Sequence, residues 1–203
     1  MDKGTSINPS EAVTSPPPKL STWQKFFYGT GCVFELTKWL IVLIVLGTLV
    51  HFYIGTISIV DGQSMEPNFH SGEYLIVNRW TYLFGTPSRG DPVVLRFPGD
   101  PEHVKYIKRI IGLPGEKVSI QSGSVYINDQ KLPESYLAPG TQTYPNMTKQ
   151  LGSEDYFLMG DNRLNSSDSR IWGVCPKRDL IGKPWYALWP LEVFGKVNHT
   201  AAN

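Results

Sequence analysis

The sequence is short of charge and of cysteine. Only 18% of its 203 residues are charged, below the ~25% typical of soluble domains. Nineteen Lys and Arg stand against eighteen Asp and Glu, which leaves a formal net charge of +1. A nucleic-acid-binding domain normally carries a basic patch or a high pI, so this balance argues against one. Two cysteines and four scattered histidines show no metal-ligand spacing, so we expect neither a metal ion nor another cofactor.

One segment lacks charge altogether. The 22 residues between Lys38 and Asp61 include no Asp, Glu, Lys or Arg, and residues 39–50 are almost purely aliphatic. About 20 residues of helix cross a hydrocarbon layer of roughly 30 Å. A buried core helix is rarely apolar all round at this length, and a cleaved signal peptide has a shorter charged segment before it and a small-residue site after it. We therefore expect a transmembrane helix at residues 36–55.

The flanking charges orient this helix. Lys19, Lys25 and Lys38 lie before its charge-free run, whereas no Lys or Arg follows that run until Arg79. The positive-inside rule then places the N-terminus in the cytoplasm, with residues 1–35 as a mostly disordered tail. Cys32 and Cys175 fall on opposite sides of the membrane, so they are not expected to form a disulfide bond with each other.

The remainder, residues 56–195, is rich in short strands separated by Gly, Pro or Asp. The expected strands include a run at 57–60 directly after the span and the runs 74–77, 92–97, 104–111, 117–120, 124–127 and 155–159, with hairpin turns at 121–123 and 128–130. No ten-residue stretch here has a helical period, so at most one short helix is expected, near Trp80–Phe84. The pattern predicts an all-β, compact, antiparallel fold with a surface loop at 134–152 and a tail at 196–203.

A first candidate for chemistry is Ser64, which lies in the segment Gly62–Pro67. The flanking Gly and Pro predict a tight turn at the end of a strand, and most serines in such turns have only a structural role. A serine nucleophile also needs a base. The histidines outside the membrane have no distinctive context, so a Ser-His-Asp triad has no support.

Lysine offers another base. In the strand 104–111 the period of two puts Lys108 on one face with Val104, Tyr106 and Ile110. Apolar neighbours desolvate a lysine, lower its pKa and favour the neutral amine that a general base requires. The alternative is a solvated lysine whose stem covers apolar surface.

The third cluster is residues 160–170, which is dense in Asp, Asn, Ser and Arg and follows an apolar strand. Such a composition usually indicates a solvated loop. Its charges alternate in sign, however, and could form a lattice of ion pairs and hydrogen bonds that fixes a site.

Taken together, the motifs resemble those of bacterial type I signal peptidase, a membrane-anchored Ser/Lys protease. The resemblance runs from about residue 36 to 190 and rests on four blocks: Ser64-Met65-x-Pro67, Arg89-Gly90-Asp91, Tyr106–Gly115, and Gly160–Arg163 with Ser166, Asp168, Ser169 and Arg170. It implies that Ser64 is the nucleophile and Lys108 the general base. It also implies that Ser166 orients the lysine.

The resemblance assigns the remaining residues to support. Arg109, Asp161, Asn162, Arg163, Asp168 and Arg170 match the structural lattice of the family. Some members have a hydroxyl two residues before the nucleophile as an oxyanion donor, and here that position is Gly62. Either a backbone group substitutes for it or the donor is absent.

The implied reaction is removal of signal peptides from secreted preproteins after a small-x-small site, by a single-pass enzyme of the cell membrane with its catalytic domain outside. The implied partners are preproteins and membrane lipid. Trp80, Phe84, Trp185 and Trp189 either rest on the lipid or pack in the core. Two alternatives remain: a Ser/Lys peptidase for one exported or pilus substrate, and a non-catalytic membrane-anchored β domain that binds exported chains.

Overall fold

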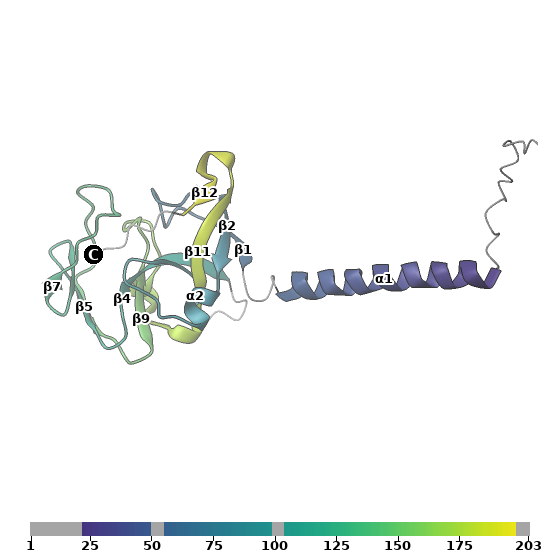
Figure 1. Ribbon diagram of the computed structural model, residues 1–203. Helices are drawn as coiled ribbons and strands as arrows, with labels where there is room; N and C mark the ends of the chain where they lie inside the picture. The colour runs from purple at the N-terminus through teal and green to yellow at the C-terminus, as the bar shows by residue number, and fades with distance from the viewer. Residues whose placement is uncertain (1–21, 50–54, 99–103, 198–203) are drawn as a thin grey trace, which may run out of the picture. The chain divides into compact units, whose positions relative to one another are not determined.

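In the computed structural model, residues 22–49, 55–98 and 104–197 are described, with the backbone alone for residues 22–32. The chain divides into two compact units, Met1–Gly47 and Thr48–Asn203. Figure 1 shows helix α1 (Thr22–Leu49) and a β-rich domain.

Helix α1 differs from the expected span. It begins at Thr22 rather than at residue 36. Residues 1–21 and 50–54 lie outside the described residues, and Gly55 is not helical. Within the described residues, no helix combines the length and the apolar character needed to cross a membrane.

The β-rich unit confirms the expectation of a mostly antiparallel β fold. Its strands are β1 (Thr56–Ile59), β2 (Tyr74–Asn78), β3 (Pro92–Arg96), β4 (Lys105–Gly112), β5 (Lys117–Gln121), β6 (Ser124–Ile127), β7 (Gln130–Lys131), β8 (Met147–Gln150), β9 (Asp155–Met159), β10 (Cys175–Pro176), β11 (Leu180–Trp189) and β12 (Gly195–Lys196). The short helices are α2 (Trp80–Leu83), α3 (Ser169–Trp172), η2 (Lys177–Asp179) and η3 (Leu191–Val193).

These strands form two antiparallel sheets. The larger has the order β1-β2-β11-β3-β4-β9-β10, with β12 paired to β11, and the smaller has the order β7-β6-β5-β8. The predicted hairpin turns join β5 to β6 and β6 to β7. Ser122, Gly123, Asn128 and Asp129 have the positive φ angles that tight hairpin turns require.

The two sheets meet at Gly112, the last residue of β4. A Cβ atom there would lie 2.8 Å from a methyl group of Leu151 and 3.0 Å from Cβ of Phe157, and still closer to Val118. Only glycine allows this approach. The core of the smaller sheet packs against the ends of β4 and β9, through Ile111, Val118, Ile120, Phe157 and Met159.

Two further apolar clusters lie under the larger sheet. One holds Val93, Leu95, Ile110 and Leu158, which fixes β4 between β3 and β9. The other holds Val60, Met65, Phe69, Leu75, Ile107 and Ala187, beneath the segment that follows β1. The centre of β4 is therefore buried on both faces.

Three elements differ from the sequence-based expectation. Strand β11 is the longest strand described and was not predicted as one. Strand β8 lies within 134–152, which was expected to be loop alone. Helix α2 was predicted, but α3 is a second short helix within the polar cluster 160–170 and its edge, so the limit of one short helix was wrong.

Candidate active site

The Ser64 turn, residues 61–67, follows β1. Met65 is completely buried in the cluster below it and anchors the turn. Gly62 has a φ of +88°, a left-handed conformation that glycine adopts without strain. The backbone N–H of Asn162 donates a hydrogen bond to the Ser64 carbonyl oxygen at 3.0 Å. Buried Met65 and the segment after β9 therefore fix the position of Ser64, the candidate nucleophile.

Lys108 lies in the middle of β4, opposite Val93 of β3. Its side chain is 2% exposed, and its Nζ lies 2.5 Å from Ser64 Oγ. No carboxylate of the described residues lies within ion-pair distance of this amine. The fold thus brings together two residues that are 44 positions apart.

The surroundings of Lys108 favour its neutral form. Burial lowers the pKa of this lysine from its ordinary value of 10.5 to about 8. The charge of Asp168 opposes this shift, and that of Arg170 adds to it. A neutral amine in contact with a hydroxyl can accept its proton, so the pair has the properties of a nucleophile and its base.

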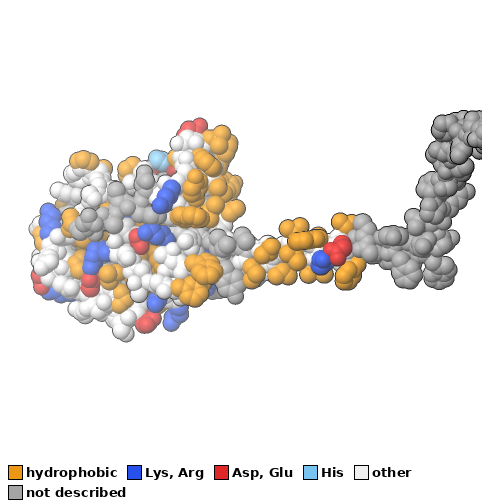
Figure 2. Space-filling model, viewed as in Figure 1, with side chains coloured by type: hydrophobic (Ala, Val, Ile, Leu, Met, Phe, Trp, Pro, Cys, Tyr) orange, Lys and Arg blue, Asp and Glu red, His pale blue; other side chains and the backbone are white. Residues whose placement is uncertain are grey.

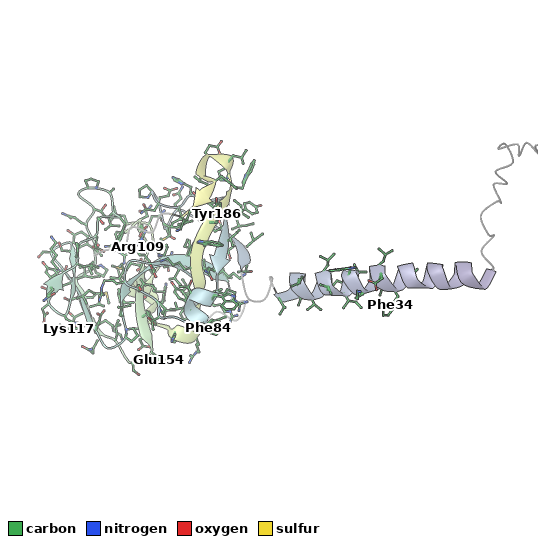
Figure 3. All side chains as sticks on the ribbon, viewed as in Figure 1. Phe34, Phe84, Arg109, Lys117, Glu154 and Tyr186 are labelled. Atoms are coloured by element: carbon green, nitrogen blue, oxygen red, sulfur yellow. The ribbon has the colours of Figure 1, made fainter. Side chains whose placement is uncertain are left out.

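A buried ion pair braces the back of the site. Arg109, adjacent to the lysine, donates from Nε to Asp161 Oδ1 at 2.7 Å and from Nη2 to Oδ2 at 2.5 Å. Both side chains are at most 3% exposed, and Figure 3 shows Arg109 in the middle of the domain. Asn68 donates to the same carboxylate at 2.8 Å, which links the pair to the chain just beyond the Ser64 turn. Bidentate geometry of this kind fixes orientation as well as distance.

A second ion pair, between Arg170 and Asp168, lies next to the end of β9. Arg170 donates from Nε and Nη2 to the two oxygens of Asp168, at 2.8 and 2.7 Å. Burial alone would raise the pKa of Asp168, but the hydrogen bond and charge of Arg170 lower it below its ordinary value. Asp168 also accepts from the N–H of Gly160 at 3.0 Å.

Arg163 has a partner outside the expected lattice. Its guanidinium forms an ion pair with Glu134 and a hydrogen bond with Thr143, both from the loop before β8. Nε of Arg163 also donates to the Gly160 carbonyl at 3.2 Å. The sequence did not identify Glu134 and Thr143 as partners of Arg163. The composition of a polar loop does not indicate which distant cation the loop will contact.

Ser166 forms no hydrogen bond with the lysine. Its Oγ is buried, and the bond to Lys108 that the resemblance implies is absent; the hydroxyl instead helps to lower the pKa of Asp168. Ser166 and the Ser64 carbonyl both lie against Gly160, where an added Cβ would clash with each. Gly160 is thus the spacer between the two serines.

Ser71 is a further polar group that sequence reasoning missed. The Gly62 N–H donates to Ser71 Oγ at 3.2 Å. Ser71 also lines an open hollow of about 520 Å³ that is bounded by Ser64, Lys108 and Tyr106. Gly62 carries no side-chain hydroxyl, and Ser71 in the following turn places one beside it.

A much smaller hollow, about 20 Å³, lies between β1 and β4. Its walls include Val60, Leu75, Ile107 and Tyr106. It shares Tyr106 and Asp61 with the larger hollow, so the two are neighbours. Space this small next to Ser64 admits only short side chains. In the described part of the chain, no three His, Cys, Asp or Glu residues are grouped closely enough to hold a metal ion.

This chain is similar in sequence to several known proteins. Residues 33–189 match the family described as signal peptidase, peptidase S26. Signal peptidase I S of Bacillus subtilis is 36% identical over 177 residues, which cover 82% of this chain and 94% of that protein. A probable signal peptidase I-2 of Synechocystis is 33% identical over 172 residues, which cover 82% of this chain and 78% of that protein. A crystal structure of a signal peptidase I from Enterococcus faecalis aligns with a TM-score of 0.43 and 28% identity, over 48% of this chain and 96% of that chain.

Proposed function

The chain belongs to the signal peptidase family, peptidase S26, and we propose that Ser64 and Lys108 are the nucleophile and general base with which it removes signal peptides from preproteins. The observation that carries this assignment is the 2.5 Å contact between Lys108 Nζ and Ser64 Oγ in a buried setting.

The contact supports a two-step reaction. The neutral amine of Lys108 takes the Ser64 proton as Oγ attacks the scissile carbonyl, and then passes it to the leaving amine. In the second step the same amine activates the water that hydrolyses the acyl-enzyme. Arg109, Asp161, Asn162, Arg163, Asp168 and Arg170 position these groups and transfer no proton, which fits their engagement in hydrogen bonds and ion pairs.

The oxyanion of the tetrahedral intermediate needs donors. The Ser64 backbone N–H is the first. The hydroxyl of Ser71 is the second, because it lies beside Gly62 in the hollow that contains Ser64 and keeps its own hydrogen free while it accepts from the Gly62 N–H. Ser166 keeps the role of a positioning residue through its contact with the Gly160 segment.

Substrate choice follows from the hollow between β1 and β4. Its volume of about 20 Å³ suits the small side chains that precede the scissile bond at a small-x-small site. Preproteins are therefore the partners of this site.

The membrane part of the assignment rests on sequence pattern and exposed aromatic side chains. We place the span within residues 36–55, since the charge-free run continues from α1 through residues 50–54. Residues 1–35 would then be cytoplasmic, with 56–195 as the extracytoplasmic peptidase domain and 196–203 as a tail. Trp80, Phe84, Trp185 and Trp189 are all exposed, which favours contact with lipid over core packing.

One assay tests the catalytic proposal. The full chain in detergent is given several preproteins, alongside Ser64→Ala and Lys108→Ala variants. Both variants should lose cleavage while remaining folded. If Lys108→Ala cleaves at a near-normal rate at neutral pH, the assignment of the base is wrong. Cleavage of one preprotein among many would favour the specialised peptidase, and binding without cleavage by the unaltered chain would favour a non-catalytic β domain.

A further inference from the structure

A third hollow lies in the β-rich domain, away from the active site. Its volume is about 420 Å³, and it lies between α2, η2 and the start of β11. None of its lining residues belongs to the Ser64 turn, to β4 or to the 160–170 cluster. We call it the basic hollow after the side chains that line it: Arg79, Arg96, Lys177 and Arg178, with Glu154 as the single carboxylate.

The cations of the basic hollow have no carboxylate partners in the described part of the chain. Among the described residues, none of the four forms an ion pair, although the same structure pairs Arg89, Arg109, Arg163 and Arg170 with carboxylates. The five charged side chains give the hollow a net charge of +3, in a chain whose total is +1. A concentration of unpaired positive charge around a concave surface attracts an anion.

A buried tyrosine forms part of the wall of the hollow. Tyr82 lines the hollow and is 8% exposed, and its hydroxyl is shut off from solvent with no hydrogen-bond partner among the described residues. This hydroxyl lies outside the reach of a ligand in the hollow, so the contacts to an anion come from the four cations.

The rim of the basic hollow is apolar. Leu83 lines the hollow, and Trp80 and Phe84 flank it in α2 and directly after it, with their rings 4.9 Å apart. All three are exposed. Figure 2 shows blue basic side chains beside orange apolar ones at the edge of the domain where Figure 1 labels α2, and Figure 3 labels Phe84 and Glu154 near this edge. A soluble anion would need the charges but not this exposed aromatic rim.

We propose that the basic hollow binds the phosphate headgroup of an anionic phospholipid, with Arg79 and Arg178 on the phosphate and the α2 aromatics against the acyl chains. Basic groups next to interfacial aromatics are the combination that recognises an anionic membrane surface. The site goes beyond signal-peptide removal and contains no catalytic residue.

The test uses the full chain in a neutral detergent and follows its thermal unfolding. A ligand that binds the folded state raises the midpoint in proportion to its affinity. The probes are dihexanoyl phosphatidylglycerol, dihexanoyl phosphatidylcholine with the same chains and a neutral headgroup, and glycerol phosphate without chains. We expect a saturable rise with phosphatidylglycerol and little or none with the other two.

Paired variants distinguish binding at the basic hollow from nonspecific electrostatic attraction of the anionic lipid to the protein. Arg79→Gln combined with Arg178→Gln should weaken phosphatidylglycerol binding at least about tenfold, because two charge-assisted contacts are lost. Lys131→Gln combined with Lys149→Gln makes the same charge change at exposed positions of the smaller sheet and should leave binding unchanged.

Three outcomes would overturn the proposal: an equal response to phosphatidylcholine, an equal affinity for glycerol phosphate, or an equal loss in the control pair. Ser64→Ala should keep the lipid response. A failure of the catalytic assignment and a failure of the lipid site therefore give different results.

Discussion

Lys108 Nζ lies 2.5 Å from Ser64 Oγ, while the lysine side chain is 2% exposed. The proposed nucleophile comes from a turn that faces an open hollow, and the proposed base comes from a strand buried on both faces. Ser64 is thus reachable by a peptide, whereas the amine of Lys108 meets little water. Five predictions follow from this geometry and from the residues that hold Ser64 and Lys108 in position.

The rate should depend on pH through the lysine. Because burial lowers the pKa of Lys108 to about 8, kcat/KM should rise as pH increases through about 8 and level off above it. Steady-state cleavage of a preprotein across the pH range measures this. A rate that stays constant from about pH 6 to about pH 9 would contradict the role of the lysine as base.

Lys108→Met should abolish cleavage and stabilise the fold. The pKa of Lys108 is about 8 in the folded chain and 10.5 as an ordinary lysine, so between these values the unfolded chain binds more protons and stability increases with pH. At neutral pH, below both values, the folded state carries the full cost of about 3 kcal/mol, which Met of similar length removes. Urea unfolding in detergent measures the gain. A less stable variant would show that the lysine is not destabilised by burial.

Gly160→Ala should reduce cleavage without unfolding the protein. The added Cβ would overlap the Ser64 carbonyl oxygen and Ser166 Oγ, so the Ser64 turn must shift. A displacement of about 1 Å at a reacting group can cost about 10²-fold in rate. Gly47→Ala is the matched control, since nothing lies within 4 Å of its Cβ. Equal activity of the two variants would contradict the spacer role of Gly160.

Asp161→Ala should destabilise the fold by about 3–5 kcal/mol, because it leaves the charge of Arg109 buried without its partner. The double variant, with Arg109→Met added, should lose less than the sum of the single changes. Lys117→Ala, which breaks an exposed pair with Asp129, should cost at most about 1 kcal/mol. Additive losses at Arg109 and Asp161 would mean that the pair is not coupled.

Ser71→Ala should lower kcat by about 10²-fold with little change in KM, as expected for a donor that acts on the transition state. Ser167→Ala is the control, because Ser167 lines the same hollow and is also exposed. If kcat is unchanged in Ser71→Ala, the oxyanion is stabilised by backbone donors alone.

Local sequence patterns were enough to find most strands. The runs that became β2, β3, β5, β6 and β9 each carry β-branched or aromatic residues between turn residues, so their propensity and their fold agree. Strand β11 was missed because Pro184 lies in its interior, where proline removes a backbone donor. The structure accommodates it where the register of β11 against β2 shifts, between Pro184 and Tyr186.

The motifs indicated the candidate site, but they did not indicate how deeply Lys108 is buried. Alternation along β4 predicted one apolar face for Lys108, whereas the packed sheets bury Ile107, Arg109 and Ile111 on the other face as well. The partner of Arg163 is Glu134, 29 positions earlier, and no local pattern identifies such a pair. Long-range contacts of this kind arise from sheet packing and are not encoded in any short window.

The means by which the pKa of Lys108 is lowered has a consequence for the solution conditions under which the site works. Ions dissolved in water screen exposed charges within a Debye length of about 8 Å at physiological ionic strength, but they screen buried groups much less. Since burial is the largest cause of the lowered pKa, and neighbouring charges are secondary, salt has little effect on the base. A peptidase domain with such a base would therefore keep the same reactivity in dilute and in saline media.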